Sequence, residues 1–199
     1  MSVATSDDVL QFWFGPPGSP PLEGSTKWWT KSDAFDAEIR ERFEDTIAAA
    51  AAGELEAWKA TPRGRLALVV LLDQFSRNAF RGTPRSFAQD DRARDLALEA
   101  LDSGEDRRLE PIERSFLYMP LMHSENADLQ RKCIAAFERL CDVTTAPDLQ
   151  KYTANNLDYA KKHAEIIERF GRFPHRNDIL ERESTPEEVE FLKQPGSSF

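Results

Sequence analysis

The sequence predicts an all-α protein made of antiparallel helical hairpins, and three observations support this prediction. The 199 residues contain 23 Ala and 19 Leu against 6 Val and 7 Ile, a balance that favours helices over strands. Apolar residues recur at helical spacing, and no stretch convincingly resembles a strand. Helix caps, glycines and prolines divide the chain into segments of helical length. We therefore expect roughly eight to ten helices, joined by short loops, in a single domain over residues 1–199.

The first helix is expected to start at Ser6, because two aspartates follow it near the positive end of the helix dipole. It should end at Gly15. Residues 15–21 are almost entirely Pro and Gly, a composition typical of a loop. Trp28 and Trp29 follow, and we expect them to anchor this loop to the body of the protein.

A second helix is expected from Ser32 to about Ala52, because apolar residues there recur every fourth position and Gly53 supplies a stop. Residues 54–60 predict a short helical piece. The next helix should span roughly residues 63–75 and fade through Asn78. Its apolar run of seven residues, 66–72, is typical of a buried helix.

The remaining helices are predicted by the same signals. Pro111 suits the first position of a helix, and Pro120 should kink or stop that helix. Thr185 is followed directly by a proline and, three residues later, by a glutamate, a pattern that predicts a last short helix. The other expected helices cover about residues 87–101, 127–140 and 149–170.

Composition excludes several classes of function. The net charge of -9 argues against a broad nucleic-acid interface and against attraction to an anionic membrane surface. The longest apolar run is far shorter than the roughly 20 residues that cross a bilayer, and Met1–Asp8 does not resemble a signal peptide. We therefore expect a cytoplasmic protein, with Cys133 and Cys141 as reduced core residues. No pair of His or Cys has metal-ligand spacing, so no metal or other cofactor is predicted.

Polar side chains gather directly after the apolar run of the central helix. Asp73 and Arg77 lie four residues apart in the order that favours an ion pair within a helix. A polar end on a buried helix needs partners, which are either backbone groups and neighbouring side chains or a ligand. The candidate residues of this segment are Asp73, Gln74, Arg77, Asn78 and Arg81.

Two further groups could carry chemistry. The first surrounds Pro120 and comprises Tyr118, His123, Ser124 and Glu125, which also suit an ordinary capped turn. The second comprises Arg172, His175, Arg176 and Asn177. On the preceding helix, His163 is expected to be a histidine at the edge of the core.

Arginines concentrate in the two segments that end in Arg-Asn, residues 75–78 and 173–177. Arginine suits bidentate contacts with carboxylate or phosphate, so Arg77, Arg81, Arg172 and Arg176 could bind an anion. Our leading hypothesis is a groove for a small anionic molecule or an acidic peptide segment. One rival is a hydrolase-like enzyme with His123 or His175 as base and Asp73 or Glu125 as orienting carboxylate. Another is a scaffold that binds a partner protein; the oligomeric state is not predicted.

Four ordered motifs resemble a bacterial family known as domain of unknown function 924. They are Val9–Gly15, Leu71–Pro84, Phe116–Glu125 and Phe170–Asn177. The resemblance implies an all-helical, tetratricopeptide-like right-handed superhelix, and it implies no established activity, cofactor or catalytic residue. Ser76 stands where the family motif usually has proline, and Met122 where it usually has glutamate. The typical 34-residue tetratricopeptide signature is not visible.

Overall fold

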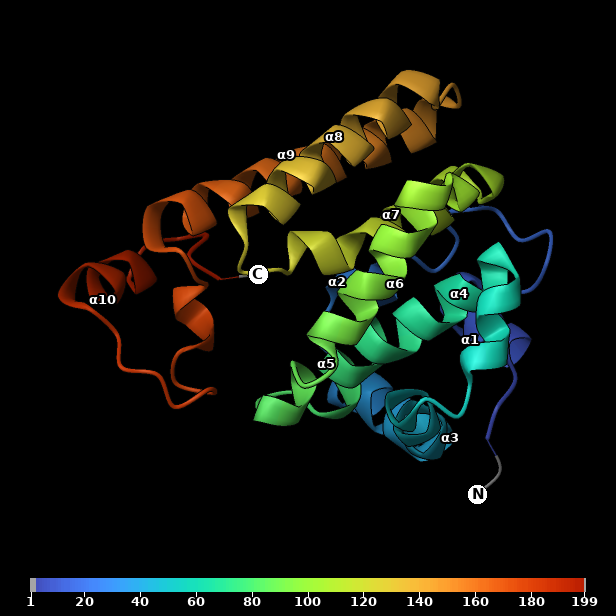
Figure 1. The fold of residues 1–199 in the computed structure, drawn as a ribbon, viewed down its shortest axis with the longest axis horizontal. Helices are drawn as coiled ribbons and strands as arrows, with labels where there is room; N and C mark the ends of the chain where they lie inside the picture. The colour runs from blue at the N-terminus through green and yellow to red at the C-terminus, as the bar shows by residue number, and fades with distance from the viewer. Residues whose placement is uncertain (1–2, 199) are drawn as a thin grey trace. The chain divides into compact units, whose positions relative to one another are not determined.

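The computed structural model describes residues 3–198, and its helices confirm the all-α prediction (Figure 1). No strand occurs among these residues. The tetratricopeptide-like superhelix stays a prediction. The α-helices are α1 Ser6–Phe14, α2 Thr26–Trp29, α3 Asp33–Ala52, α4 Pro62–Val69, α5 Ser76–Ala79, α6 Asp90–Ser103, α7 Pro111–Met122, α8 Ala127–Val143, α9 Pro147–Phe170 and α10 Pro186–Leu192. The shorter turns are the 3-10 segments η1 Glu56–Ala60, η3 Pro84–Ser86, η4 Glu105–Arg108 and η5 Pro174–Arg176, and the π-helical segment η2 Val70–Phe75.

The chain divides into two compact units. Unit 1 consists of the residues up to Arg81 together with Arg85–Pro120, and unit 2 consists of Gly82–Pro84 together with the residues from Leu121 onward. That residues 1–199 form a single domain stays a prediction.

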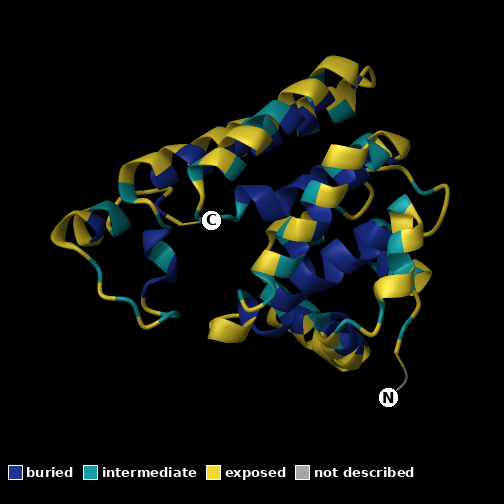
Figure 2. Cartoon of the chain, in the orientation of Figure 1, coloured by how far each residue is buried: buried dark blue, intermediate teal, exposed yellow. Residues whose placement is uncertain are grey.

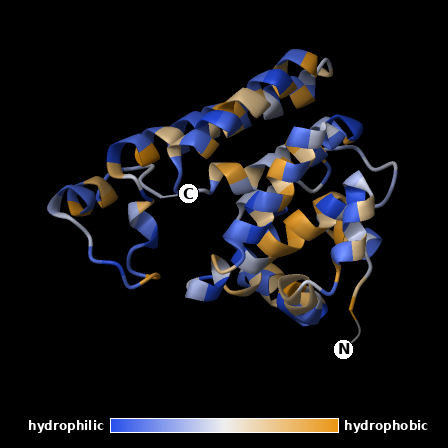
Figure 3. Ribbon diagram, in the orientation of Figure 1, coloured by the Kyte–Doolittle hydropathy of each residue, from blue (hydrophilic) through white to orange (hydrophobic). Residues whose placement is uncertain are grey.

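The core of unit 1 is built around α4. Every residue from Gly64 to Phe75 is buried, and Figure 2 shows α4 in the buried colour among helices with exposed outer sides. The same helix is the most continuously hydrophobic part of Figure 3. Aromatic rings from α1, α3, η2 and α7 pack against one another, with Trp13 edge-on to both Phe75 and Phe116 at 5.5 and 5.6 Å. This packing fixes the position of the polar segment that follows.

The central helix changes its hydrogen-bond period in the middle. It runs without interruption from Pro62 to Ala79 as α4, η2 and α5, longer than the predicted 63–75. The hydroxyl of Ser76 donates to the carbonyl of Leu71 at 3.1 Å, which satisfies an acceptor inside the π-turn. The sequence did not predict this turn, because its period depends on packing rather than on local propensity.

Several predicted boundaries are confirmed. Helix α3 starts after its cap Ser32, whose hydroxyl accepts from Phe35 N, and ends at Gly53, which adopts the left-handed conformation with φ 82°. Helix α10 has the predicted capping box between Thr185 and Glu188. Helix α1 starts at Ser6 as predicted, and the residue before it, Thr5, is its cap and accepts from Asp8 N. Helix α6 starts at Asp90 rather than near residue 87, because η3 and a turn precede it.

The prediction that Pro120 kinks or stops its helix was wrong about where α7 ends. The helix continues through Pro120 to Met122. Proline lacks only the N–H that would bond the carbonyl four residues earlier, and one missing bond near a helix end is tolerated. A turn follows, and Asn126 caps α8 by accepting from Asp128 N and Leu129 N.

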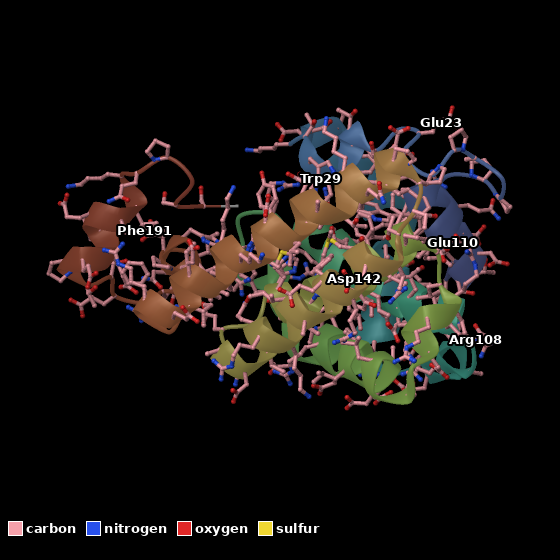
Figure 4. All side chains as sticks on the ribbon, turned by 90° about the horizontal axis from the view of Figure 1, so that it is seen from above. Glu23, Trp29, Arg108, Glu110, Asp142 and Phe191 are labelled. Carbon is pink, nitrogen blue, oxygen red and sulfur yellow. The ribbon has the colours of Figure 1, made fainter. Side chains whose placement is uncertain are left out.

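Unit 2 is built on the antiparallel hairpin of α8 and α9, which lie side by side (Figure 1). Ile166, Ile167 and Phe173 form a buried cluster near the end of this hairpin. Phe170 and Phe191 pack on it with ring centroids 4.9 Å apart, and Figure 4 labels Phe191 on α10. Gly171 ends α9 in the left-handed conformation, as predicted, and turns the chain into η5.

Trp28 and Trp29 behave differently from each other. Trp28 is buried, and its indole N–H donates to the carbonyl of Trp13 at 3.0 Å, so it anchors the end of the proline-rich loop as predicted. Trp29, labelled in Figure 4, is 57% exposed, although one face stacks on Phe116. The prediction that Trp29 is also an apolar anchor was therefore wrong, because most of this side chain is exposed.

Both cysteines are free thiols; Cys133 is buried and Cys141 is only half-buried. Within residues 3–198, no helix combines the length and the apolar character that crossing a membrane requires.

Candidate functional site

The predicted polar end of the central helix is a buried ion-pair cluster in unit 1. Asp73 has no exposed surface, and its Oδ1 accepts from Nε and Nη2 of Arg77 at 3.2 and 3.0 Å, which confirms the predicted pair. Its Oδ2 accepts from Gln74 at 2.6 Å. Arg77 also donates to Asp90 at 2.9 Å and lies over the ring of Phe87. Two carboxylates of the chain therefore share this guanidinium.

Asn78 and Arg81 converge on Asp36 of α3. The amide of Asn78 donates to Asp36 Oδ1 at 2.7 Å, and Arg81 donates to both carboxylate oxygens at 2.5 and 3.0 Å. Burial raises the pKa of Asp36, but the bonds from Arg81 and Asn78 outweigh it and leave the pKa below its usual value. Sequence reasoning missed Asp36, because its partners lie 42 and 45 residues away.

Tyr118 is turned into unit 1. It is completely buried, its hydroxyl donates to Asp106 at 2.6 Å, and Nε of Arg114 donates to it at 3.1 Å. Burial and Asp106 raise the pKa of this phenol, so it stays neutral. These bonds join η4 to α7.

A polar network in unit 2 links the α7–α8 turn to the segment after α9. The carboxylate of Glu125 accepts from both terminal nitrogens of Arg182 at 2.6 and 2.9 Å and from the backbone N–H of Phe173 at 2.8 Å. Arg182 also donates to the side-chain oxygen of Asn177 at 3.1 Å. The network thus fixes the backbone on both sides of η5.

The same network continues through Glu188. Arg172 donates to both of its carboxylate oxygens, at 2.7 and 2.8 Å, and Asn177 donates to it at 3.3 Å. Arg172 lowers the pKa of Glu188 to about 2. The capping box revealed Glu188 as a helix cap, but nothing in the sequence indicated its arginine partner, and Arg182 was missed altogether.

The three histidines of the chain lie close together in unit 2: His163 and His175 contact the ring of Phe173, and His123 contacts His163. The rings of His123 and His163 are 6.2 Å apart, and Phe173 lies 5.6 Å from both His163 and His175. The guanidinium of Arg176 sits over Phe173 at 4.7 Å and donates to the carbonyl of His123 at 2.9 Å. We call these five residues, His123, His163, Phe173, His175 and Arg176, the histidine corner.

His163 is the buried member of the corner, with 5% of its surface exposed. This confirms its prediction as a core-edge histidine. Its Nδ1 is 2.8 Å from the carbonyl of Tyr159, so the neutral ring donates to that oxygen. Burial, with the charges of His123, His175 and Arg176, lowers the pKa of His163 to about 3. His123 and His175 are half-buried.

The structure brings together some of the predicted site residues. His123, Glu125, Arg172, His175, Arg176 and Asn177 lie within one continuous arrangement of unit 2. Asp73, Gln74, Arg77, Asn78, Arg81 and Tyr118 all belong to unit 1. The approach of the two Arg-Asn segments to each other stays a prediction.

A shallow cleft of about 360 Å³ in unit 1 was not predicted. It lies at the starts of α1 and α4 and is lined by Ser6, Asp7, Thr61, Pro62, Arg63, Gly64 and Arg108. Figure 4 labels Arg108 at the surface of this unit. Among residues 3–198, no group of three or more His, Cys, Asp or Glu side chains is arranged to hold a metal ion.

Comparisons with other proteins agree with the helical architecture. The family described as bacterial protein of unknown function (DUF924) matches residues 9–196. A solved structure of a protein of unknown function from Agrobacterium tumefaciens is 41% identical in sequence, with a TM-score of 0.75. The similarity covers 94% of this chain and 96% of that chain. No match was found among curated proteins.

Proposed function

We propose that the chain, which belongs to the DUF924 family of bacterial proteins of unknown function, binds a small anionic molecule at its histidine corner. The observation that carries the proposal is the convergence of His163, His175 and Arg176 on Phe173, with the ring of His123 beside that of His163. In a chain of net charge -9, the guanidinium of Arg176 supplies a permanent positive charge at this corner, beside imidazole groups that can donate hydrogen bonds.

The charges around the corner favour an anion. Arg176 is permanently charged and offers several N–H donors, and the half-buried rings of His123 and His175 can also donate hydrogen bonds. The adjacent carboxylate, Glu125, is neutralised by its bidentate pair with Arg182. A carboxylate or phosphate ligand would therefore meet cationic donors.

The proposal gives other predicted residues a supporting role. Arg172 is bound to Glu188, and Asn177 bridges Arg182 and Glu188, so these side chains hold the backbone that carries His175 and Arg176. Arg77 and Arg81 of unit 1 are bound to carboxylates of their own unit. Direct ligand contact is assigned to His123, His175 and Arg176 only.

Isothermal titration tests the proposal with three probes: inorganic phosphate, succinate and a glutamate-rich peptide. The wild type should bind at least one of them, and Arg176→Gln should weaken that binding about tenfold or more, since a charge-assisted contact contributes about 1.5–3 kcal/mol. Arg169→Gln is the matched control, because Arg169 belongs to the same unit and pairs with Glu187 on the surface. Equal binding by Arg176→Gln, with the fold intact by circular dichroism, would reject the site.

No specific observation favours the two rival functions. For an acid-base enzyme, Glu125 is occupied by Arg182 and by the N–H of Phe173, and Asp73 by Arg77 and Gln74. For a scaffold, the large exposed apolar side chains among the described residues lie on five separate segments. They are Val3, Trp29, Val143, Tyr159 and Val189.

A further inference from the structure

His163 occupies an unusual position for a titratable side chain. It projects from α9 into the buried side of unit 2, with its ring edge-on to Phe173 at an interplanar angle of 77°. Phe173 is completely buried and belongs to the apolar cluster that attaches the segment after α9 to the hairpin. The imidazole is therefore part of the surface on which this segment, residues 171–192, is packed.

The groups that face His163 in unit 2 come from three elements. The α7–α8 turn contributes His123, η5 contributes His175 and Arg176, and α9 itself contributes the carbonyl of Tyr159. All of the facing side chains are cationic or can become so. The carboxylate in the same turn, Glu125, is bound to Arg182 and to the N–H of Phe173. A proton on His163 would thus add a buried positive charge beside others of the same sign.

We propose that His163 is an acid-sensitive latch: protonation of its buried ring releases the segment of residues 171–192 from α9. The neutral ring fits the cluster and donates to the Tyr159 carbonyl, whereas the charged ring needs water or an anion as partner. The released segment contains Phe173, His175 and Arg176, so opening removes three of the five residues from the corner.

The sign and size of the effect follow from proton linkage. Burial lowers the pKa of His163 from 6.5 in an open chain to about 3 in the closed structure. The open state therefore binds more protons below pH 6.5, and closure weakens progressively from there down to pH 3. Between pH 7 and pH 5 the opening equilibrium constant should rise about 20-fold.

The two carboxylates that bind the arginines of this segment, Glu188 within it and Glu125 in the α7–α8 turn, do not account for a change in this range. Arg172 lowers the pKa of Glu188 to about 2. Burial raises the pKa of Glu125, but Arg182 and the Phe173 N–H outweigh it and leave the pKa below its usual value. Both carboxylates keep their charge at pH 5, so their loss of charge would destabilise the segment only in stronger acid.

The opening itself does not depend on the proposed anion site. The consequence of the opening for ligand binding does depend on that site. If the proposed function is correct, acid separates the residues that bind the anion, and the anion is released. Measuring the opening without ligand therefore keeps the two proposals distinguishable.

Hydrogen exchange of the full-length protein, without ligand, tests the latch. Protection factors for residues 171–192 are measured at pH 7 and pH 5 and corrected for the intrinsic exchange rate at each pH. In the wild type they should fall about 20-fold. In His163→Gln, which cannot titrate, they should be equal at the two pH values, whereas the control His123→Gln should retain a clear fall.

Two results would overturn the latch. One is equal protection at pH 7 and pH 5 in the wild type, and the other is an undiminished fall in His163→Gln. Because that variant could fold poorly, the wild type supplies a second measurement: an NMR titration of the three imidazoles. The latch requires that His163 stays neutral at pH 5 in the closed state, so titration of all three rings near pH 6.5 would also reject it.

Discussion

Removing the Glu125 carboxylate should destabilise unit 2 strongly. In the variant Glu125→Ala, Arg182 loses both of its bonds to carboxylate and the N–H of Phe173 loses its acceptor. Both side chains of the pair are about three-quarters buried, with 25% and 24% of their surface exposed. Because about a quarter of each side chain remains exposed, the loss should lie at the lower end of the 3–5 kcal/mol typical of a broken buried pair, at about 3 kcal/mol.

The assay must report on unit 2 by itself. All four tryptophans, Trp13, Trp28, Trp29 and Trp58, lie in unit 1, so their fluorescence measures that unit. Native-state hydrogen exchange of the α9 amides measures the free energy of opening in unit 2. The expected 3 kcal/mol corresponds to a fall in α9 protection of about two orders of magnitude.

A matched control is the exposed pair of Arg131 and Asp128 on α8, whose side chains are 62% and 79% exposed. Arg131→Ala should cost less than about 0.5 kcal/mol. In a double-mutant cycle, Glu125 and Arg182 should be coupled by about 1 kcal/mol or more. A cost for Glu125→Ala as small as that of Arg131→Ala, or a coupling near zero, would refute the view that this pair holds the corner.

Three further predictions concern unit 1. Gly64→Ala should cost about 2 kcal/mol or more in urea unfolding, because the new Cβ would overlap the carbonyl oxygen of Trp58, and a wild-type midpoint would contradict this. Tyr118→Phe should cost about 1–2 kcal/mol, because the buried carboxylate of Asp106 loses a hydrogen bond; calorimetry measures it, and an unchanged Tm would be inconsistent. Asp36 contributes stability above its unfolded pKa that is lost as pH falls through its lowered folded pKa, so tryptophan-detected acid unfolding should occur below about pH 4 and depend less on pH in Asp36→Asn.

The elements that the sequence predicted best are those with local signals. The cap Ser32 and the left-handed Gly53 defined α3, and the capping box of Thr185 and Glu188 defined the start of α10. Each of these signals involves residues only a few positions apart, so the local sequence alone is sufficient to predict where the helix begins or ends. The pair of Asp73 and Arg77 was predictable for the same reason.

The elements that were missed depend on tertiary contacts. The π-turn η2 and the passage of α7 through Pro120 reflect packing that compensates for irregular backbone bonding. The partnership of Glu125 with Arg182 spans 57 residues. Local periodicity contains no information about contacts at that separation.

The histidine corner lies between these two cases. The sequence singled out His123 and His175 as candidates and His163 as a core-edge residue. Their proximity was not predicted, because it follows from how α9 and η5 fold back toward the α7–α8 turn. The residue types were therefore predictable, while their common location required the structure.

The most direct test of the anion site is an imidazole NMR spectrum of the full-length protein at pH 7 during separate titrations with inorganic phosphate, succinate and the glutamate-rich peptide, at least one of which should bind. The chain has three histidines, so every resonance reports on the histidine corner. If an anion binds at His123, His175 and Arg176, the His123 and His175 resonances should show saturable shifts. These shifts should be greatly reduced in Arg176→Gln and retained in Arg169→Gln. Resonances that do not move, or that move equally in both variants, would contradict a specific anion site at this corner.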